Sequence, residues 1–280
     1  MDVAERIRAE GARLTAAERR VAATVLESPQ LVAFGTVADL ARTAEVGAAS
    51  VVRLANKLGF DGYSELQHCI QGELSAQLRP AAERIHDSSS QSVAAHAEVE
   101  LANVRSTLAA VGDDALVVLV ERLADVDRPV LILSGEATAG VARLFVDQLS
   151  QLRRDVECVQ GSEVAVRRTI ALADPTSTAV VIDLRRYERW VLLAHAALAD
   201  RGVWSAVLTD GVLSPLAQRA DSTFVVTAGS VGPFDSHVGT LAVLNLITNS
   251  VADALRASAA DRLEAIESAW GVAGALTDGT

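Results

Sequence analysis

The segment from Asp183 to Glu188, DLRRYE, concentrates strongly polar side chains in consecutive positions. The guanidinium groups of Arg185 and Arg186 each present a rigid fork of N–H donors, which suits bidentate binding of a carboxylate or a phosphate. Asp183 could select hydroxyl or amine groups of the same molecule, and Tyr187 adds a phenol. The segment therefore predicts a site for a small anionic metabolite. The alternative is that these side chains fill the available space themselves.

A second polar set, Ser50, Arg53 and Lys57, recurs at intervals of three and four residues, which is the spacing of one helix face. Arg53 can donate hydrogen bonds to a guanine edge or a phosphate, and Ser50 can contact either. Ala48 and Ala49 could touch a thymine methyl group. Arginines outside this helix, and Lys57 itself, are expected to contact phosphates. The full set of candidate DNA-binding residues is Thr36, Ala48, Ala49, Ser50, Arg53, Lys57, Arg19, Arg20 and Arg42.

Catalytic chemistry has weaker support in the residue pattern. The five histidines are scattered along the chain, and Cys69 and Cys158 are isolated, without metal-ligand spacing. Glu136 could act as a base and His237 could line a pocket, but the chain has no Gly-rich phosphate loop and no nucleophile elbow. We therefore expect a protein that is not an enzyme and needs no cofactor or metal. A sugar-phosphate isomerase remains the less favoured alternative.

The composition limits the class of protein. A net charge of −11 argues against a protein that coats nucleic acid without specificity, although a few local arginines suffice for a sequence-specific reader. We expect no membrane span, because no apolar run approaches the ~20 residues that a span needs. The start of the sequence shows no secretory signal, and the two isolated cysteines suit reduced thiols. These features predict a cytoplasmic protein without a membrane partner.

The first part of the sequence predicts short helices. Thr15 with Glu18 and Thr36 with Asp39 have the spacing of capping boxes, and Gly59 is a natural helix stop. Residues 36–58 predict two helices joined by a tight turn at Val46-Gly47. Val46 and Val52, together with Leu40, are expected to fill the angle between them, so that Ala48, Ala49, Ser50, Arg53 and Lys57 face outward. By periodicity alone, a helical bundle with surface arginines is an equal alternative to a DNA reader.

After Pro129, short apolar runs alternate with helical stretches. Near-continuous Val, Ile and Leu indicate strands buried on both faces, hence a parallel sheet covered by helices. We therefore predict an all-helical N-terminal domain followed by a doubly wound α/β sandwich. The predicted strands are Val130–Leu133, Val156–Val159, Ala179–Leu184, Val203–Leu208 and Thr223–Val226, and the predicted helices lie near 93–125, 139–152, 163–172, 188–201, 214–219 and 236–270.

A polar segment after Arg79 marks the predicted boundary between the domains. We expect a DNA-binding domain at 1–77, a linker at 78–92 and a second domain at 93–270, with its core at 128–256.

The run LTAAERRVAATVLESPQLVAFGTVADLARTAEVGAASVVRLANKLGFDGYSELQ resembles the N-terminal domain of RpiR/MurR-type bacterial transcriptional regulators. It carries the leading T-x-x-E-R, the L-A before the turn, the V-V-R of the recognition helix and the tail K-L-G-F-x-G-Y-S-E-L. Gly47 stands where the family usually has a capping Ser, and Gln67 replaces a usual Lys. The resemblance implies a helix-turn-helix that binds a double-stranded DNA operator.

Residues 128–256 resemble a SIS (sugar isomerase) domain, the usual companion of that DNA-binding domain. Its best match is LTDGVLSPLAQRAD from Leu208 to Asp221, followed by Phe234-Asp-Ser236. Such domains are doubly wound and bind phosphosugars at the carboxyl ends of their strands. The resemblance implies that Gly135, Glu136, Thr138, Ser214 and Ser236 join Asp183, Arg185, Arg186 and Tyr187 as ligand-binding residues.

The sequence departs from that family at the DLRRYE segment, where the family has S-x-S-G-x-T. Three interpretations remain open: arginines that replace the backbone cradle for an anionic metabolite, a scaffold without ligand that serves dimerisation, and ordinary phosphosugar binding. Helices at 93–125 and 236–270 offer more apolar surface than one sandwich needs, so we expect a homodimer or a tetramer.

Overall fold

Reciprocal capping boxes begin two helices in the first part of the chain. Thr15 Oγ1 accepts a hydrogen bond from the Glu18 backbone N (3.3 Å), and the Glu18 carboxylate accepts one from the Thr15 backbone N (2.8 Å). Thr36 and Asp39 repeat this exchange at 3.2 and 2.9 Å. Each box satisfies amide groups that the first helical turn leaves without partners, as the spacing predicts.

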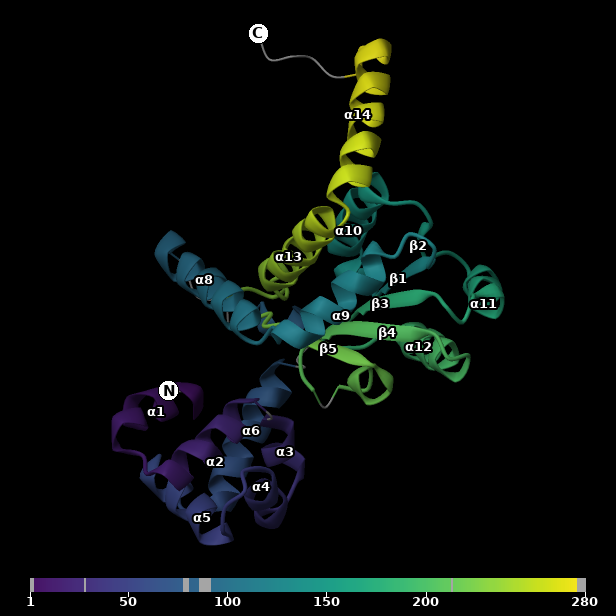
Figure 1. The fold of residues 1–280 in the computed structure, drawn as a ribbon. Helices are drawn as coiled ribbons and strands as arrows, with labels where there is room; N and C mark the ends of the chain where they lie inside the picture. The colour runs from purple at the N-terminus through teal and green to yellow at the C-terminus, as the bar shows by residue number, and fades with distance from the viewer. Residues whose placement is uncertain (1–2, 28, 78–80, 86–91, 213, 276–280) are drawn as a thin grey trace. The chain divides into compact units, whose positions relative to one another are not determined.

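The computed structural model describes residues 3–27, 29–77, 81–85, 92–212 and 214–275 (Figure 1). They fall into two units, Met1–Arg84 and Ile85–Thr280. The predicted limits at 77 and 92 stay predictions, because most of the expected linker lies outside the described residues. Within that linker, the described part contains the short helix α7 (Ala81–Arg84).

The first unit consists of helices around one apolar core. Leu40, Val51, Leu54 and Leu66 are fully buried in it. Its elements are α1 (Val3–Glu10), the 3-10 helix η1 (Gly11–Arg13), α2 (Ala16–Glu27), α3 (Pro29–Phe34), α4 (Val37–Thr43), α5 (Ala48–Lys57), α6 (Tyr63–Gln77) and α7.

The turn between α4 and α5 is a Schellman motif. Val46 N donates to Ala41 O (2.9 Å) and Glu45 N donates to Arg42 O (3.1 Å), while Glu45 has the left-handed φ of 51°. The end of α5 uses the same device with Gly59 (φ 85°) in the left-handed position, as predicted. Both turns fix the direction in which the chain leaves a helix.

The second unit contains a five-stranded parallel sheet of order β2-β1-β3-β4-β5. The strands are β1 (Val130–Ser134), β2 (Val156–Cys158), β3 (Thr178–Ile182), β4 (Trp204–Thr209) and β5 (Ser222–Val225). The order reverses direction between β1 and β3, which is the switch point where doubly wound folds bind ligands. The predicted fold class is confirmed.

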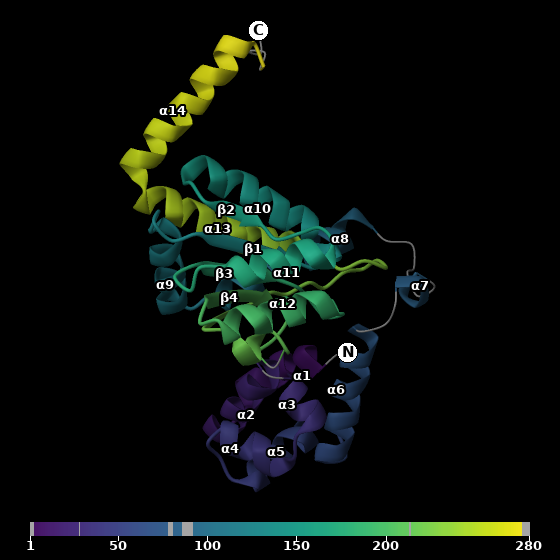
Figure 2. The same ribbon diagram turned by 90° about the vertical axis from the view of Figure 1, so that its right-hand side faces the viewer.

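Apolar side chains cover both faces of this sheet. Ile132 and Val180 point into one core with α9, α10 and α13, whereas Leu133 and Val181 point into the other with α11 and α12 (Figures 1 and 2). The helices are α8 (Val93–Ala109), α9 (Asp113–Ala124), α10 (Ala139–Leu152), α11 (Glu163–Leu172), α12 (Arg189–Asp200), α13 (Val238–Ala254) and α14 (Arg256–Ala273), with 3-10 helices η2 (Glu136–Thr138) and η3 (Ala217–Arg219).

Two predicted elements differ from the structure. The helix expected at 214–219 is only the three-residue η3, because the backbone turns extended at Ala220 and leads into β5. The long C-terminal helix breaks at Leu255 rather than near Ser258.

The prediction that no segment is apolar and long enough to span a membrane also needs correction. Val238–Ala273 meets that criterion by length and composition. Val243, Ile247 and Val251 of α13 are nevertheless buried in the core that covers the sheet, which is the property of a core helix.

Candidate functional sites

Helix α5 presents one face to solvent and the other to the core of the first unit. Ala48, Ala49 and Arg53 are exposed as predicted. Ser50, predicted to face outward, is instead 6% exposed, and its Oγ accepts a hydrogen bond from Arg53 Nη2 (3.0 Å). Ser50 therefore orients Arg53, and any direct contact to a base would require the Ser50 side chain to leave the core.

The expected core position of Val52 is also wrong. Val51 is fully buried and Val52 is 38% exposed, because Val51 shares the inward face with Leu54 and Ala55. Sequence reasoning thus missed Val52 as an outward residue, although its spacing of four from Ala48 could have shown it.

Lys57 is engaged within the first unit. Its Nζ lies 2.9 Å from Glu18 Oε2 and donates to Arg13 O at 2.7 Å. Glu18 is buried, and its pKa falls to about 2, mainly because the Thr15 backbone N donates to it and also because Lys57 does. Lys57 joins α5 to α2, and the phosphate contact expected for it stays a prediction.

The other cations predicted to meet phosphates are exposed. The Arg19 side chain is exposed, Arg20 donates to Glu45 O at 3.4 Å, and Arg42 pairs with Asp39 beside Thr36. The side chain of Arg42 is 74% exposed. Exposed ion pairs of this kind contribute little stability, so these guanidiniums can exchange partners at small cost.

The second candidate site lies at the carboxyl ends of β1 and β3. Parallel strands direct these ends to one edge, so the loop 135–138 meets the segment 183–188 there. The contact is tight, because a Cβ on Gly135 would lie 2.6 Å from Asp183 Oδ1. Thr138 is 1% exposed and donates to Ile182 O at 2.8 Å, so its hydroxyl joins the two loops, and its predicted ligand contact stays a prediction.

Asp183 organises the segment that follows it. Its carboxylate accepts hydrogen bonds from Leu184 N (3.0 Å) and Glu188 N (2.8 Å). Burial raises the pKa of Asp183 to about 6 in spite of these hydrogen bonds, and the carboxylates of Glu188 and Asp210 add to the increase. The buried Asp183 carboxylate thus stabilises the conformation of the 183–188 segment by binding its backbone amides. Its predicted contact with ligand hydroxyl or amine groups stays a prediction.

The two adjacent guanidiniums do not form the paired fork that the sequence suggested. Arg185 is 10% exposed at its side chain, and its Nη1 lies 2.6 Å from Asp235 Oδ1, whereas Arg186 is exposed. Arg185 has a left-handed φ of 57°, which few residues other than glycine adopt. Tyr187 donates to Asp210, and burial raises the pKa of its phenol.

Glu188 is the residue that sequence reasoning missed. Its two carboxylate oxygens accept hydrogen bonds from the Glu136 backbone N and from Trp190 Nε1, the latter at 2.6 Å. Glu136 itself keeps an exposed side chain. Glu136 and Glu188 lie 52 residues apart, so no local sequence pattern predicts their hydrogen bond. Only the expected proximity of the two loops in the fold could have suggested it.

The remaining predicted ligand residues have internal partners. Ser214 accepts a hydrogen bond from Ala217 N (3.2 Å), and Ser236 donates to Glu100 of α8. Helix α8 also holds the segment before α13 through Asn103, whose amide exchanges two hydrogen bonds with Gly229 (2.7 and 3.0 Å). Ser236 thereby anchors the stretch that contains Asp235.

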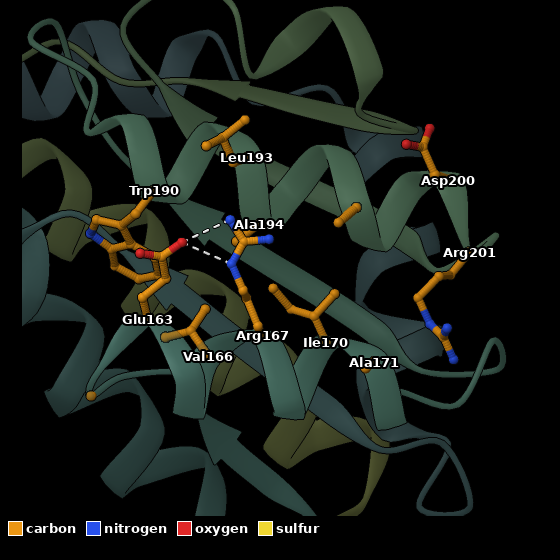
Figure 3. A pocket seen from close by; sticks show the side chains of 12 residues that line it. Glu163, Val166, Arg167, Ile170, Ala171, Trp190, Leu193, Ala194, Asp200 and Arg201 are labelled. Atoms are coloured by element: carbon orange, nitrogen blue, oxygen red, sulfur yellow. Dashed lines mark hydrogen bonds and ion pairs between the residues drawn. The ribbon is translucent and has the colours of Figure 1, made fainter.

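A separate hollow of about 630 Å³ lies between α11 and α12 (Figure 3). Val166, Ile170 and Ala194 line it, together with the ion pair of Glu163 with Arg167 (2.7 Å). None of the predicted ligand residues lines it. Within the described ranges, no group of three or more His, Cys, Asp or Glu could hold a metal ion.

Comparison with known proteins places these two sites in context. Residues 1–77 match the helix-turn-helix domain of the rpiR family. The chain is 24% identical over 253 residues to an uncharacterized HTH-type transcriptional regulator of Caldanaerobacter subterraneus, covering 88% of this chain and 89% of the relative. A similar protein of Haemophilus influenzae is 25% identical, with coverages of 76% and 75%.

Two solved structures share the fold. The sugar isomerase domain of an RpiR transcription factor from Sphaerobacter thermophilus is 29% identical, with a TM-score of 0.56, covering 61% of this chain and 96% of that one. The NanR protein of Vibrio vulnificus, complexed with ManNAc-6P, is 21% identical, with a TM-score of 0.59 and coverages of 99% and 100%.

Proposed function

The chain is a transcriptional regulator whose residues 1–77 belong to the rpiR family of helix-turn-helix domains, and from this premise we propose that α5 is its recognition helix. The exposed face of α5 supports the proposal: small Ala48 and Ala49 allow close approach to a groove, and Arg53 lies one turn further along. Ser50 holds the Arg53 guanidinium over that face. The phosphate contacts are assigned to Arg19, Arg20 and Arg42 around it.

The test measures binding to the DNA upstream of the protein's own gene by fluorescence anisotropy over a range of salt concentrations. Arg53→Ala is expected to weaken binding by about 10- to 100-fold, because a bidentate contact to guanine contributes roughly 1–3 kcal/mol. Arg143→Ala, which removes an exposed arginine of α10 paired with Asp147, serves as the control. If the DNA affinity of Arg53→Ala equals that of the wild type, α5 is not the recognition helix.

For the second unit we propose the binding of a small anionic metabolite at the carboxyl ends of β1 and β3. Its position at the switch point of the sheet supports this, as does the fold shared with a NanR protein that binds ManNAc-6P. The exposed Arg186 would bind the anionic group first. Arg185 would then exchange its ion pair with Asp235 for a contact with the same group. Sugar phosphates, sugar acids and other carboxylates belong to this class.

Arg185→Ala/Arg186→Ala is expected to abolish the effect of an active metabolite on DNA binding without unfolding the chain. A thermal-shift screen of sugar phosphates, sugar acids and carboxylates supplies the metabolite, and Arg143→Ala again is the control. An undiminished response in the double variant would favour the second candidate, a dimerisation scaffold. The internal bonds of Arg185, Tyr187 and Glu188 favour that alternative.

We further propose that the chain acts in the cytoplasm and does not catalyse a reaction. Its curated relatives carry the names of regulators. Near the strand ends, His237 is half-buried with a lowered pKa, chiefly from burial, which suits a lining residue. Turnover of aldose or ketose phosphates by the purified chain would contradict this proposal.

A further inference from the structure

We propose that Glu188 determines ligand specificity in the second unit by placing its own carboxylate where the backbone would otherwise hold a phosphate. The inference rests on the proposed effector function and narrows it to unphosphorylated carboxylates, such as sugar acids. Glu188 is then an internal anion that keeps phosphate esters off the loop after β1.

The loop after β1 has the features of an anion-binding position. It leads directly into η2 and α10, and amides at the start of a helix have no partner within that helix. The Glu136 N–H is such an amide, and it donates to Glu188 Oε1. The second oxygen of Glu188 is bound by Trp190 Nε1 at 2.6 Å. Both oxygens of one carboxylate therefore take the place that two phosphate oxygens could take.

The carboxylate is held there by its own backbone. Glu188 N donates to Asp183 Oδ2 (2.8 Å), and the adjoining Tyr187 is fixed through Asp210. A group tethered in this way has an effective concentration far above that of a free metabolite. A dissolved phosphate would have to displace Glu188 from both donors, so the site discriminates against it.

The charges around the loop act in the same direction. Asp183, Asp210 and Glu188 raise the local negative charge, and Asp235 neutralises Arg185. A phosphate carries up to two negative charges, and at this position it would be repelled more strongly than a carboxylate. A singly charged carboxylate can use the exposed Arg186 further out.

Besides the Glu136 amide, which Glu188 already occupies, other polar atoms are present for a carboxylate ligand. Arg185 Nε and His237 Nδ1 are buried and have no hydrogen-bond partner among the described residues. Burial chiefly lowers the pKa of His237, and the nearby Arg185 guanidinium lowers it further. These atoms, with Arg186, offer a place for carboxylate and hydroxyl groups that does not involve the loop after β1.

The experiment compares the full-length chain with Glu188→Ala and Glu188→Gln, using inorganic phosphate, glucose 6-phosphate and gluconate as probes in isothermal titration calorimetry. Glu188→Ala frees the Glu136 amide and is expected to bind both phosphate probes at least about tenfold more tightly than the wild type. Glu188→Gln keeps an acceptor but removes the charge, so its gain should be smaller. Glu163→Ala, which breaks the exposed pair with Arg167, is the matched control and should show no gain.

Equal phosphate affinity in the wild type and in a folded Glu188→Ala variant, judged by circular dichroism, would overturn the inference. Should Glu188→Ala fail to fold, Glu188→Gln decides by the same comparison. DNA binding is measured in parallel with each probe. A gain of phosphate binding that leaves DNA affinity unchanged supports the specificity role of Glu188 and counts against the proposed effector function instead.

Discussion

At the scale of single residues, the first unit depends on a buried carboxylate that two elements share. Glu18 closes the capping box of α2 and accepts a hydrogen bond from Lys57 of α5. Its folded pKa of about 2 lies below the ordinary 4.5, so its stabilising contribution is present above about pH 4.5 and is lost as the pH falls through 2.

Glu18→Gln is therefore expected to lower the free energy of unfolding at pH 7 by about 1 kcal/mol, the usual effect of damaging a helix cap. Urea denaturation of the full chain, followed by circular dichroism, measures the change. The difference from wild type should shrink as the pH falls from 4.5 toward 2. Glu10→Gln, which removes a surface pair with Arg13, should have little effect at any of these pH values.

Asp183 behaves in the opposite sense. Its folded pKa of about 6 exceeds the ordinary 3.8, so the contribution of the protonated form is complete below about pH 4 and is lost as the pH rises through 6. The melting temperature of the wild type relative to Asp183→Ala should fall between pH 5 and pH 7. The buried His195 and the half-buried His237 remain in both proteins, so their titration largely cancels in the comparison. Parallel curves would show that Asp183 does not titrate in this range.

At the scale of elements, the turn between α4 and α5 includes one residue in a strained backbone conformation. Glu45 adopts a left-handed φ of 51° that glycine accepts more easily. Glu45→Gly is expected to stabilise the first unit by about 0.5–1 kcal/mol, measured by urea denaturation, because the roughly 1–2 kcal/mol of left-handed strain exceeds the roughly 0.5–1 kcal/mol entropic cost of glycine. Glu45→Ala removes the charge but keeps the strain, so it should give no such gain. A gain from both variants would point to the charge.

The sequence predicted these elements well where the signal is local. The capping pairs Thr15–Glu18 and Thr36–Asp39 and the stop at Gly59 depend on neighbouring residues, and all three are present. Apolar runs such as Val130–Leu133 predicted the parallel sheet for the same reason. The register of α5 was less secure, because Val51 and Val52 are both apolar and only packing against the other helices of the first unit decides which one is buried.

The candidate ligand site could be predicted only in part. The loops at 135–138 and 183–188 do meet, as the fold class required. The partners of their side chains come from contacts between distant segments, such as Arg185 with Asp235 and Glu188 with Glu136. Residue type shows that a guanidinium can bind an anion, but it does not show which carboxylate of the chain already occupies it.

At the scale of the whole molecule, the expected dimer needs a surface, and α14 offers one. This helix has 18 residues, yet only Ala259 is buried, while Ile266 and Trp270 continue the same apolar stripe. Helices in water usually depend on packing along such a stripe. A dimer would present two helix-turn-helix units to the two half-sites of a pseudo-palindromic operator.

Ile266→Glu/Trp270→Glu is therefore expected to shift the chain from dimer to monomer in sedimentation equilibrium and to weaken operator binding. Val164→Glu, a change at an exposed apolar residue of α11, is the control. If the double variant sediments like the wild type, α14 does not form the dimer interface.

The tie between Lys57 and Glu18 has a chemical consequence. Lys57 is the single lysine of the sequence, since every other residue in the Lys+Arg count is arginine. An amine-reactive ester can therefore form only one side-chain adduct on the whole chain. Because that amine is bound by Glu18 and by the Arg13 carbonyl, its labelling rate reports how often the Lys57 ammonium leaves these two partners. Labelling of the full chain therefore measures the stability of one side-chain contact between α5 and α2.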